Sequence, residues 1–467
     1  MINVFEFQKV KTSKLPDSWK ADGALDELEL FLQRNWEQRG IFYSDHTISS
    51  RQQFIDFDRR DGFKTQNYIG TITFRGEQLN IFPKIFREDE DDHDASDLDV
   101  KDLINDLIMW LGYCDKLNFP FVSLKGEMSD ADTFLELFIT VYIHYVKAAV
   151  DRQLFFRYEE IEETGSAPKG KIDFKDYALR KYPTGQWNKL QYTYSSFVFD
   201  NLLNRVIKCT CRMLDGITKH TQNRRIIHDI LMKLGDISDI NCTPYDCDTI
   251  HLNSLQANYT IILSMSKMFL LNKVSSHNMG LSDALCFLFP AELLFEAFIA
   301  GFIRQNFKSV AKISTQARDL YLAELVVDGE VIGNRFLLKE DIVVQIEDTI
   351  IILDTKYKEI DRLSRIKKDS DRLGISDADM KQMAIYASRR GAKRLFLLYP
   401  LYRGTLPDET EVVFNIYAGD GNDAPKIPLQ ILQVPFAFGN DAKTAKDLLL
   451  KILKTALDVK SQDILTL

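Results

Sequence analysis

The chain has 467 residues, of which 45% are hydrophobic and 27% charged, an ordinary balance for a globular protein of about two to four domains. The 31 Phe, 18 Tyr and 4 Trp residues exclude a mainly disordered chain. The net charge of −9 argues against a protein that coats nucleic acid by bulk positive charge, but it is compatible with a local basic groove.

The sequence favours a cytoplasmic protein without a membrane partner. The longest apolar stretch, residues 134–145, includes Glu136 and His144 and is shorter than the about 20 residues that cross a bilayer, so we expect a buried helix there. The N-terminal residues lack the charged-then-apolar layout of a secretory signal. Six cysteines do not make a disulfide framework, and we expect reduced thiols.

The first 280 residues are predicted to change from strands to helices. Residues 1–86 are β-rich and include a hairpin that turns at Arg75-Gly76-Glu77. Apolar residues then recur at helical spacing over residues 102–154. Strand and loop are expected over 155–195, and helices over 197–214 and 224–234.

The last part of the chain has an α/β pattern. The predicted elements are a helix over 290–305, a β-hairpin over 336–357, a helix over 377–390, a strand over 394–399 and a final helix over 442–459. The predicted fold class is therefore an α+β multidomain protein. Its parts are a β-rich N-terminal adaptor with the following helix (1–160), a mainly helical middle (161–280) and a C-terminal α/β domain (281–467).

The sharpest chemical signal is the hairpin that includes Asp341 and Asp354. Two β-branched runs flank Glu347-Asp348, which predicts that the chain folds back at this point. If Ile346 pairs with Thr349, the register places Asp341 directly opposite Asp354. Carboxylates opposed across two strands are only about 5 Å apart and repel each other, so this hairpin needs a compensating cation.

A divalent metal is the cation that best fits this pair. Mg²⁺ is the usual choice where phosphate oxygens complete the shell. Because side chains alternate between faces, Lys356 shares the face of Asp354 and could orient or deprotonate a water that attacks phosphorus. The alternative is an edge hairpin whose polar ends are simply solvated.

The helix over 290–303 carries a second clue. It is apolar around nearly its whole circumference, and Glu296 shares its azimuth with buried positions such as Ile299 and Ile303. A carboxylate without access to water requires a cation or a hydrogen-bond donor. Glu296 is therefore expected either at the metal site or in a structural salt bridge with a lysine.

Basic residues follow the hairpin. They occur in a loop over 362–372 and on the helix over 377–390, which carries Lys381, Gln382, Arg389 and Arg390. Cations beside a metal site suit a phosphate backbone, although a solvated helix face has the same composition.

Together these motifs resemble the PD-(D/E)xK nuclease core of the McrC family, the nuclease subunits of modification-dependent (5-methylcytosine-specific), GTP-driven restriction systems. The similar segments are Leu-Leu-Phe-Glu296, Asp341, Ile-Leu-Asp354-Thr-Lys356 and Gln382-Met-Ala-Ile-Tyr-Ala, with Tyr68-Ile-Gly and Leu79-Asn-Ile-Phe-Pro-Lys84-Ile in the N-terminal half. The resemblance therefore covers most of the chain. One departure is Glu340, which stands where the family often has Pro before the first Asp.

The resemblance implies a restriction-endonuclease-like C-terminal core that cleaves double-stranded DNA. It implies catalytic roles for Asp341, Asp354, Lys356, Glu296 and Gln382, and metal ligation by Asp341, Asp354 and Glu296, with Mg²⁺ as the cofactor and Mn²⁺ as a substitute. It also implies an AAA+ GTPase partner, an McrB-like hexamer, through which alone GTP is used. The hairpin around Tyr68–Ile85, expected to be exposed with Phe74 and Arg75 at its tip, is the predicted docking element. The alternative is that this hairpin merely covers the helical region.

Two motifs are rejected and two other functions stay open. Gly165–Lys171 almost matches a phosphate-binding loop, but Ile172 replaces the Ser/Thr that would hold Mg²⁺. The spacing of Cys209, Cys211, Cys242 and Cys247 fits no common zinc site. The alternatives are a stand-alone PD-(D/E)xK nuclease that acts on DNA ends or RNA, and a non-cleaving docking protein that activates an AAA+ motor.

Overall fold

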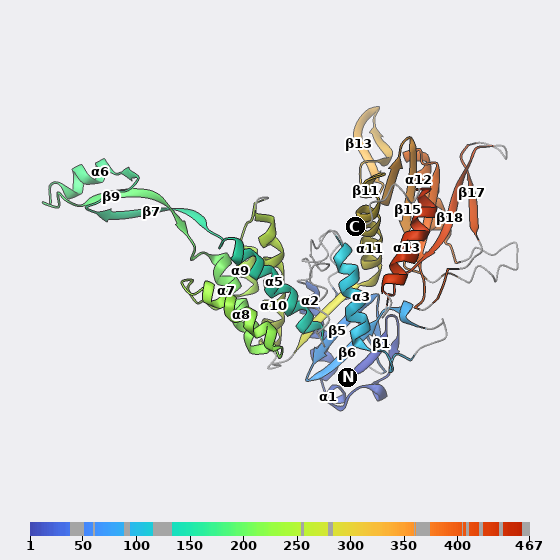
Figure 1. Ribbon diagram of the computed structural model, residues 1–467, viewed down its shortest axis with the longest axis horizontal. Helices are drawn as coiled ribbons and strands as arrows, with labels where there is room; N and C mark the ends of the chain where they lie inside the picture. The colour runs from blue at the N-terminus through green and yellow to red at the C-terminus, as the bar shows by residue number, and fades with distance from the viewer. Residues whose placement is uncertain are drawn as a thin grey trace. The chain divides into compact units, whose positions relative to one another are not determined.

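The computed structural model describes residues 1–37, 51–58, 61–87, 94–114, 133–253, 256–278, 284–358, 360, 374–403, 405–407, 411–419, 424–438 and 442–459. It shows a mixed α+β protein with two compact units (Figure 1). Unit 1 comprises Met1–Phe134 and Asp283–Leu467, and unit 2 comprises Leu135–Ser282. The divisions expected from the sequence lie after residues 160 and 280, whereas the compact units divide the chain after residues 134 and 282.

A four-stranded sheet in unit 1 joins the two ends of the sequence. Its strand order is β1-β6-β5-β10, and β10 (Leu285–Pro290) pairs antiparallel with β5 (Tyr68–Phe74). The other elements of the N-terminal part are β1 (Ile2–Phe5), β2 (Lys9–Val10), η1 (Thr12–Lys14), α1 (Asp17–Lys20), α2 (Ala24–Glu37), β3 (Ile55–Asp58), β4 (Gly62–Thr65), β6 (Glu77–Phe82), η3 (Lys84–Phe86) and α3 (Val100–Tyr113). The β-rich region predicted from the sequence is present, with two helices in addition.

The predicted β5–β6 hairpin forms, but its predicted exposure is wrong. Its turn has positive φ at both Arg75 and Gly76, the geometry of a tight type I′ turn. Phe74 is fully buried and its carbonyl accepts a hydrogen bond from Trp19 Nε1 at 2.9 Å. Arg75 donates to Glu27 Oε2 at 2.5 Å. Because α1 and α2 cover the tip, this hairpin belongs to the core of unit 1 and is not a free docking element.

A six-stranded sheet forms the second part of unit 1. Its order is β11-β14-β15-β16-β18-β17, with β15, β16 and β18 parallel to one another. The strands are β11 (Lys312–Ala317), β14 (Glu340–Ile346), β15 (Thr349–Thr355), β16 (Arg394–Pro400), β17 (Val412–Tyr417) and β18 (Lys426–Val434). The helices are α11 (Ala291–Phe307), α12 (Asp377–Arg390) and α13 (Ala442–Leu457). Helix α11 packs against β11, β14 and β15, and α12 packs against β15 and β16 (Figure 1).

Most predicted elements of this region are confirmed. Helix α12 has the predicted bounds because Ser376 caps its N-terminus in a capping box with Asp379, and Gly391 ends it with φ of 70°. The predicted hairpin is shorter than expected, because Phe336 and Leu337 belong to β13 (Glu330–Leu337). This strand pairs with β12 (Tyr321–Val327) in a separate two-stranded ribbon.

Unit 2 combines helices with a β-arm. Its helices are α5 (Phe134–Arg152), α7 (Leu202–Ile217), α8 (Thr221–Lys233), α9 (Pro244–Asp248) and α10 (Ala257–Asn278). The strands β7 (Arg157–Gly165) and β9 (Leu190–Val198) form the long arm in Figure 1, with β8 (Lys171–Ile172), α6 (Phe174–Asp176) and the π-helix η5 (Tyr177–Lys181) between them in the chain. The helix predicted from residue 197 begins later, after the cap Asn201.

Across the ranges given above, none of the helices has both the length and the apolar character that crossing a bilayer requires.

The β5–β10 pairing predicts an unequal response of two glycines to substitution. A Cβ on Gly70, whose φ is +133°, would lie 2.1 Å from the Phe287 carbonyl oxygen, whereas one on Gly76 would meet nothing within 4 Å. We expect Gly70→Ala to lower the free energy of unfolding by about 2–4 kcal/mol and Gly76→Ala by about 1 kcal/mol. Urea unfolding of both variants tests this, and equal losses would contradict the close contact of β5 with β10.

Candidate active site at the end of the β14–β15 hairpin

The β14–β15 hairpin has the register predicted from the sequence. Ile346 pairs with Thr349, and the pairing continues to Ile342 and Leu353. One further step places Asp341 opposite Asp354 at the open end of the hairpin. Because β16 runs parallel to β15, the C-terminal ends of both strands meet there, which is where α/β sheets commonly place their ligands.

Asp341 is fixed by the last residue of β15. Its Oδ2 accepts hydrogen bonds from the Thr355 backbone N–H at 2.9 Å and from the Thr355 hydroxyl at 3.0 Å. Burial raises the pKa of Asp341, although these hydrogen bonds and the charge of Lys356 act in the opposite direction. The carboxylate is therefore well oriented and poorly hydrated, which favours a neighbouring cation.

Asp354 is the more strongly perturbed carboxylate. Its residue is 1% exposed. Burial and then the charge of Asp341 raise the pKa of Asp354 to about 7, although Lys356 acts in the opposite direction. The two aspartates are thus an opposed pair of carboxylates, as the sequence predicted, of which Asp354 is buried and Asp341 half-buried.

Lys356 supplies part of the compensating charge. Its Nζ lies 2.7 Å from Asp354 Oδ2 and 3.5 Å from Asp379 Oδ1. Burial lowers the pKa of Lys356, but the neighbouring carboxylates, Asp354 above all, outweigh it and the pKa is raised. In this arrangement Lys356 is a cation that can orient a water or a phosphate oxygen, rather than a base that removes a proton.

Gln382 connects the lysine and the carboxylate from the side of α12. Its Oε1 accepts from Lys356 Nζ at 3.2 Å, and its Nε2 donates to Asp354 Oδ1 at 3.3 Å. The same Nε2 donates to the Tyr386 hydroxyl at 2.8 Å, which itself donates to the Lys339 carbonyl oxygen at 2.5 Å. One turn of α12 thus holds both the end of β15 and the residues that precede Asp341.

Glu296 pairs with a residue of the neighbouring strand β11. It is half-buried on α11, more accessible than its helix pattern predicted, and Gln316 Nε2 donates to its Oε1. Gln316 lies on β11 at the position that faces Asp341 in the antiparallel register, and its φ is 52°. The structure therefore brings Asp341, Asp354, Lys356 and Gln382 together, and it pairs Glu296 with Gln316 of the neighbouring strand.

The carboxylate pair fits Mg²⁺ as a partial ligand set. Mg²⁺ prefers oxygen ligands and is usually held by one or two carboxylates, with waters and substrate phosphates in the other positions. In the described ranges, no group of three or more His, Cys, Asp or Glu side chains is placed to hold one ion. Asp341 and Asp354 are accordingly the two side chains that would hold the metal, and Glu296 does not complete a three-carboxylate set in this conformation.

Of the basic residues predicted beside the site, Arg390 is held in ion pairs. The loop over 362–372 lies outside the described residues. Arg390 does not face solvent freely, because its guanidinium pairs with Glu340 (Nε to Oε2, 2.9 Å) and with Asp319 (Nη1 to Oδ2, 2.7 Å). Glu340, where the family often has Pro, is thus the fully buried partner of an arginine.

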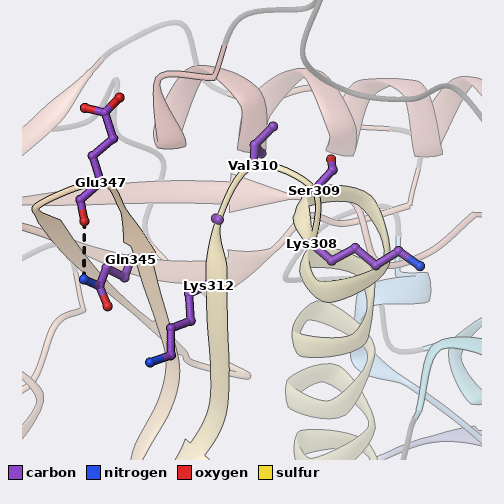
Figure 2. A pocket seen from close by; sticks show the side chains of 7 residues that line it. Lys308, Ser309, Val310, Lys312, Gln345 and Glu347 are labelled. Carbon is purple, nitrogen blue, oxygen red and sulfur yellow. Dashed lines mark hydrogen bonds between the residues drawn. The ribbon is translucent and has the colours of Figure 1, made fainter.

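A cavity lies at the opposite end of the hairpin (Figure 2). Its volume is about 640 Å³, and Gln345 Nε2 donates to the Glu347 carbonyl oxygen at 3.3 Å on one side. The residues that line it are Lys308, Ser309, Val310, Ala311, Lys312, Gln345 and Glu347. None of them belongs to the carboxylate site.

Comparison of the sequence with protein families decides the relationship. Residues 63–400 match the family described as McrBC 5-methylcytosine restriction system component. The chain belongs to this family. The match spans β5, the whole of unit 2 and the strands that carry Asp341 and Asp354. No curated protein matches the sequence.

Solved structures agree with the fold. The chain is similar to one in the refined half-complex from a tetradecameric assembly of Thermococcus gammatolerans McrB AAA+ hexamers with bound McrC, at 18% identity and a TM-score of 0.64. That similarity covers 97% of this chain and 99% of the other. It is also similar to a chain of the T. gammatolerans McrBC complex, at 18% identity and a TM-score of 0.47, over 65% of this chain and 86% of the other.

Sequence reasoning missed three residues that hold the site. In the sequence, Thr355 has no signal of its own and is simply the residue between Asp354 and Lys356. Asp379 has a sequence signal only as part of a helix capping box. Gln316 lies in a segment without any motif, and only its pairing opposite Asp341 reveals it. These residues hold neighbouring side chains in place, and that task has no local sequence pattern.

The carboxylate pair predicts a pH-dependent stability. The pKa of Asp354, raised to about 7, exceeds the value of about 3.9 in an unfolded chain. The folded state therefore binds more protons between these values, and stability is lost as the pH rises towards 7. We compare the free energy of unfolding of Asp354→Asn with that of the wild type, measured in urea with EDTA. The difference in favour of the variant should be about 2–4 kcal/mol larger at pH 8 than at pH 5. Parallel pH profiles would show that the pair carries no such strain.

Proposed function

We propose that this protein is the Mg²⁺-dependent DNA endonuclease subunit of a modification-dependent restriction system, and that its C-terminal α/β region is a PD-(D/E)xK core. The observation that carries the proposal is the convergence of Asp341, Asp354, Lys356 and Gln382 at the end of β15. Family membership supports the restriction system, and the site supports phosphodiester hydrolysis within it.

The chain's own residues would divide the work as follows. Asp341 and Asp354 would hold Mg²⁺, which when bound supplies Lewis-acid chemistry at the scissile phosphate. Lys356, held as a cation by Asp354 and Gln382, would orient the attacking water and stabilise charge on phosphate oxygens. Gln382 would keep the lysine and the carboxylate in register, and Tyr386 would tie them to the strand of Asp341.

A partner of the AAA+ GTPase class is part of the proposal. The solved relative named above is an assembly of McrB AAA+ hexamers with bound McrC, and the similarity of fold supports an equivalent partner here. The segment that almost matches a phosphate-binding loop does not have the structure of one, which supports GTP use only through that partner. Residues 166–170 connect β7 to β8, whereas a phosphate-binding loop leads from a strand into a helix.

The arm of unit 2 is the better docking element. Large apolar side chains stand exposed along it, with Phe174 and Trp187 both 69% exposed. Residues 166–189 include six lysines or arginines and two aspartates. An exposed strip of aromatic and basic residues is typical of a surface that another protein covers. The arm therefore replaces the buried β5–β6 hairpin as the proposed contact with the AAA+ ring.

The non-cleaving docking protein is the second candidate. The arm alone would serve this function equally well. However, an inactive subunit would have no use for two opposed carboxylates, of which Asp341 raises the pKa of the buried Asp354. A stand-alone nuclease would have no use for the exposed arm.

Cleavage should depend on the carboxylates and on the lysine to different degrees. With the AAA+ partner, GTP, Mg²⁺ and methylated DNA, we expect Asp341→Asn and Asp354→Asn to abolish cleavage, because each removes a metal ligand. Lys356→Ala should slow single-turnover cleavage by about 10²–10⁴-fold with DNA affinity retained. Gel assays of cleavage and binding measure both effects, and near-normal cleavage by both aspartate variants would exclude the proposed site.

The arm should determine partner stimulation without affecting the metal site. We expect Phe174→Ser with Trp187→Ser to weaken partner binding by about 10³-fold, because two buried aromatic anchors at about 2 kcal/mol each contribute about 4 kcal/mol. The matched control is Met232→Ser, which changes a side chain of unit 2 that is 81% exposed but lies on α8. GTP hydrolysis by the partner is the measurement, and an arm variant that stimulates as well as the control would refute the docking role.

A further inference from the structure

We propose that Glu6 and Lys84 are positioning residues of the nuclease site, which act through Tyr357 on the placement of Lys356. This inference rests on the proposed function, because it names residues that set the geometry of the same site. Glu6 follows β1 and Lys84 follows β6, so both come from the N-terminal part of unit 1. Tyr357 is the residue directly after Lys356.

Tyr357 is held at both its side chain and its backbone. Its hydroxyl donates to Glu6 Oε1 at 2.6 Å. Lys84 Nζ donates to the Tyr357 carbonyl oxygen at 3.1 Å and lies 4.7 Å from the centre of its ring. Phe295 and Phe436 contact the ring from other directions, at centroid distances of 6.0 and 6.2 Å. The tyrosine is thus fixed in place and direction by residues remote in sequence.

Tyr357 controls the backbone from which the Lys356 side chain extends. Strand β15 ends at Thr355, and the Lys356 N–H donates to the Leu398 carbonyl oxygen at 2.8 Å. The Lys358 N–H then donates back to the Lys356 carbonyl oxygen at 2.8 Å, so the chain turns tightly at Tyr357. A shift of Tyr357 would therefore change the direction of Lys356 relative to Asp354.

Packing alone does not explain a fully buried carboxylate at Glu6. Its residue is fully buried, and its Oε1 accepts from both the Tyr357 hydroxyl and the Lys84 N–H. Its Oε2 accepts no hydrogen bond from any side chain or backbone group that the structure describes. Burying a carboxylate in this way costs stability, and the neighbouring Phe7 also has a strained φ of 61°. Costs of this kind are typical of functional sites.

The test combines cleavage with the chemical accessibility of Lys356. We expect Tyr357→Phe and Glu6→Leu each to lower kcat by about tenfold, with KM for DNA within about twofold. The first variant loses the hydrogen bond from Tyr357 to a buried carboxylate, and the second loses both hydrogen bonds that Glu6 Oε1 accepts. Glu6→Gln keeps an acceptor oxygen at the position of Oε1 and should retain at least about a third of the rate. In a Lys356→Ala background, Tyr357→Phe should produce no further loss.

Labelling of lysines with acetic anhydride, read by mass spectrometry, provides a second measurement that needs no cleavage. Lys356, with a side chain that is 15% exposed in its ion pair, should label several-fold faster in Tyr357→Phe and Glu6→Leu, whereas the exposed Lys339 should not change. The control is Asp106→Asn, another buried carboxylate of unit 1, which accepts from the Phe438 N–H at 3.0 Å and lies on α3. It should lower stability without changing kcat or Lys356 labelling.

Two results would overturn the positioning role. One is unchanged Lys356 labelling in both variants, and the other is a loss of rate from Tyr357→Phe that is as large without Lys356 as with it. A wild-type protein that labels as expected but does not cleave DNA would instead refute the proposed function.

Discussion

The opposition of two carboxylates, the half-buried Asp341 and the buried Asp354, is the constraint around which the C-terminal part of this protein is organised. The antiparallel register of β14 and β15 brings Asp341 opposite Asp354, where burial and mutual repulsion raise the pKa of Asp354 to about 7. Lys356 offsets part of that charge at 2.7 Å. An arrangement that is costly by itself becomes favourable when a cation shares it, and the proposed nuclease function rests on this property of the hairpin.

The surroundings of the site hold the two strand ends in place. On one side Arg390 pairs with the buried Glu340, and Tyr386 donates to the Lys339 carbonyl oxygen. On the other side Thr355 binds Asp341. A proline before the first aspartate would restrict the backbone through its ring, whereas here an ion pair to α12 performs that task. Because each strand end is held by a contact to a different element, the positions of Asp341 and Asp354 are closely defined.

The two units suggest a separation of tasks within one chain. Unit 1 is assembled from both ends of the sequence through the pairing of β5 with β10, and unit 2 is inserted between them. Unit 2 presents an exposed arm with aromatic and basic side chains, whereas unit 1 holds the carboxylate site. An inserted unit with its own compact core can vary in its contacts without changing the core that orients the site.

The sequence alone determined the local features. The register of the β14–β15 hairpin follows from two β-branched runs around a polar turn, and α12 follows from its cap residues and apolar spacing. The grouping of Asp341, Asp354 and Lys356 could be predicted because it depends on one hairpin and the alternation of side chains. The tertiary structure alone decided that α1 and α2 bury Phe74, that Gln316 faces Asp341, and that Glu6 meets Tyr357 across 351 positions of the chain. Contacts of that kind depend on how separate elements pack, and neither the period of a strand nor the cap of a helix contains that information.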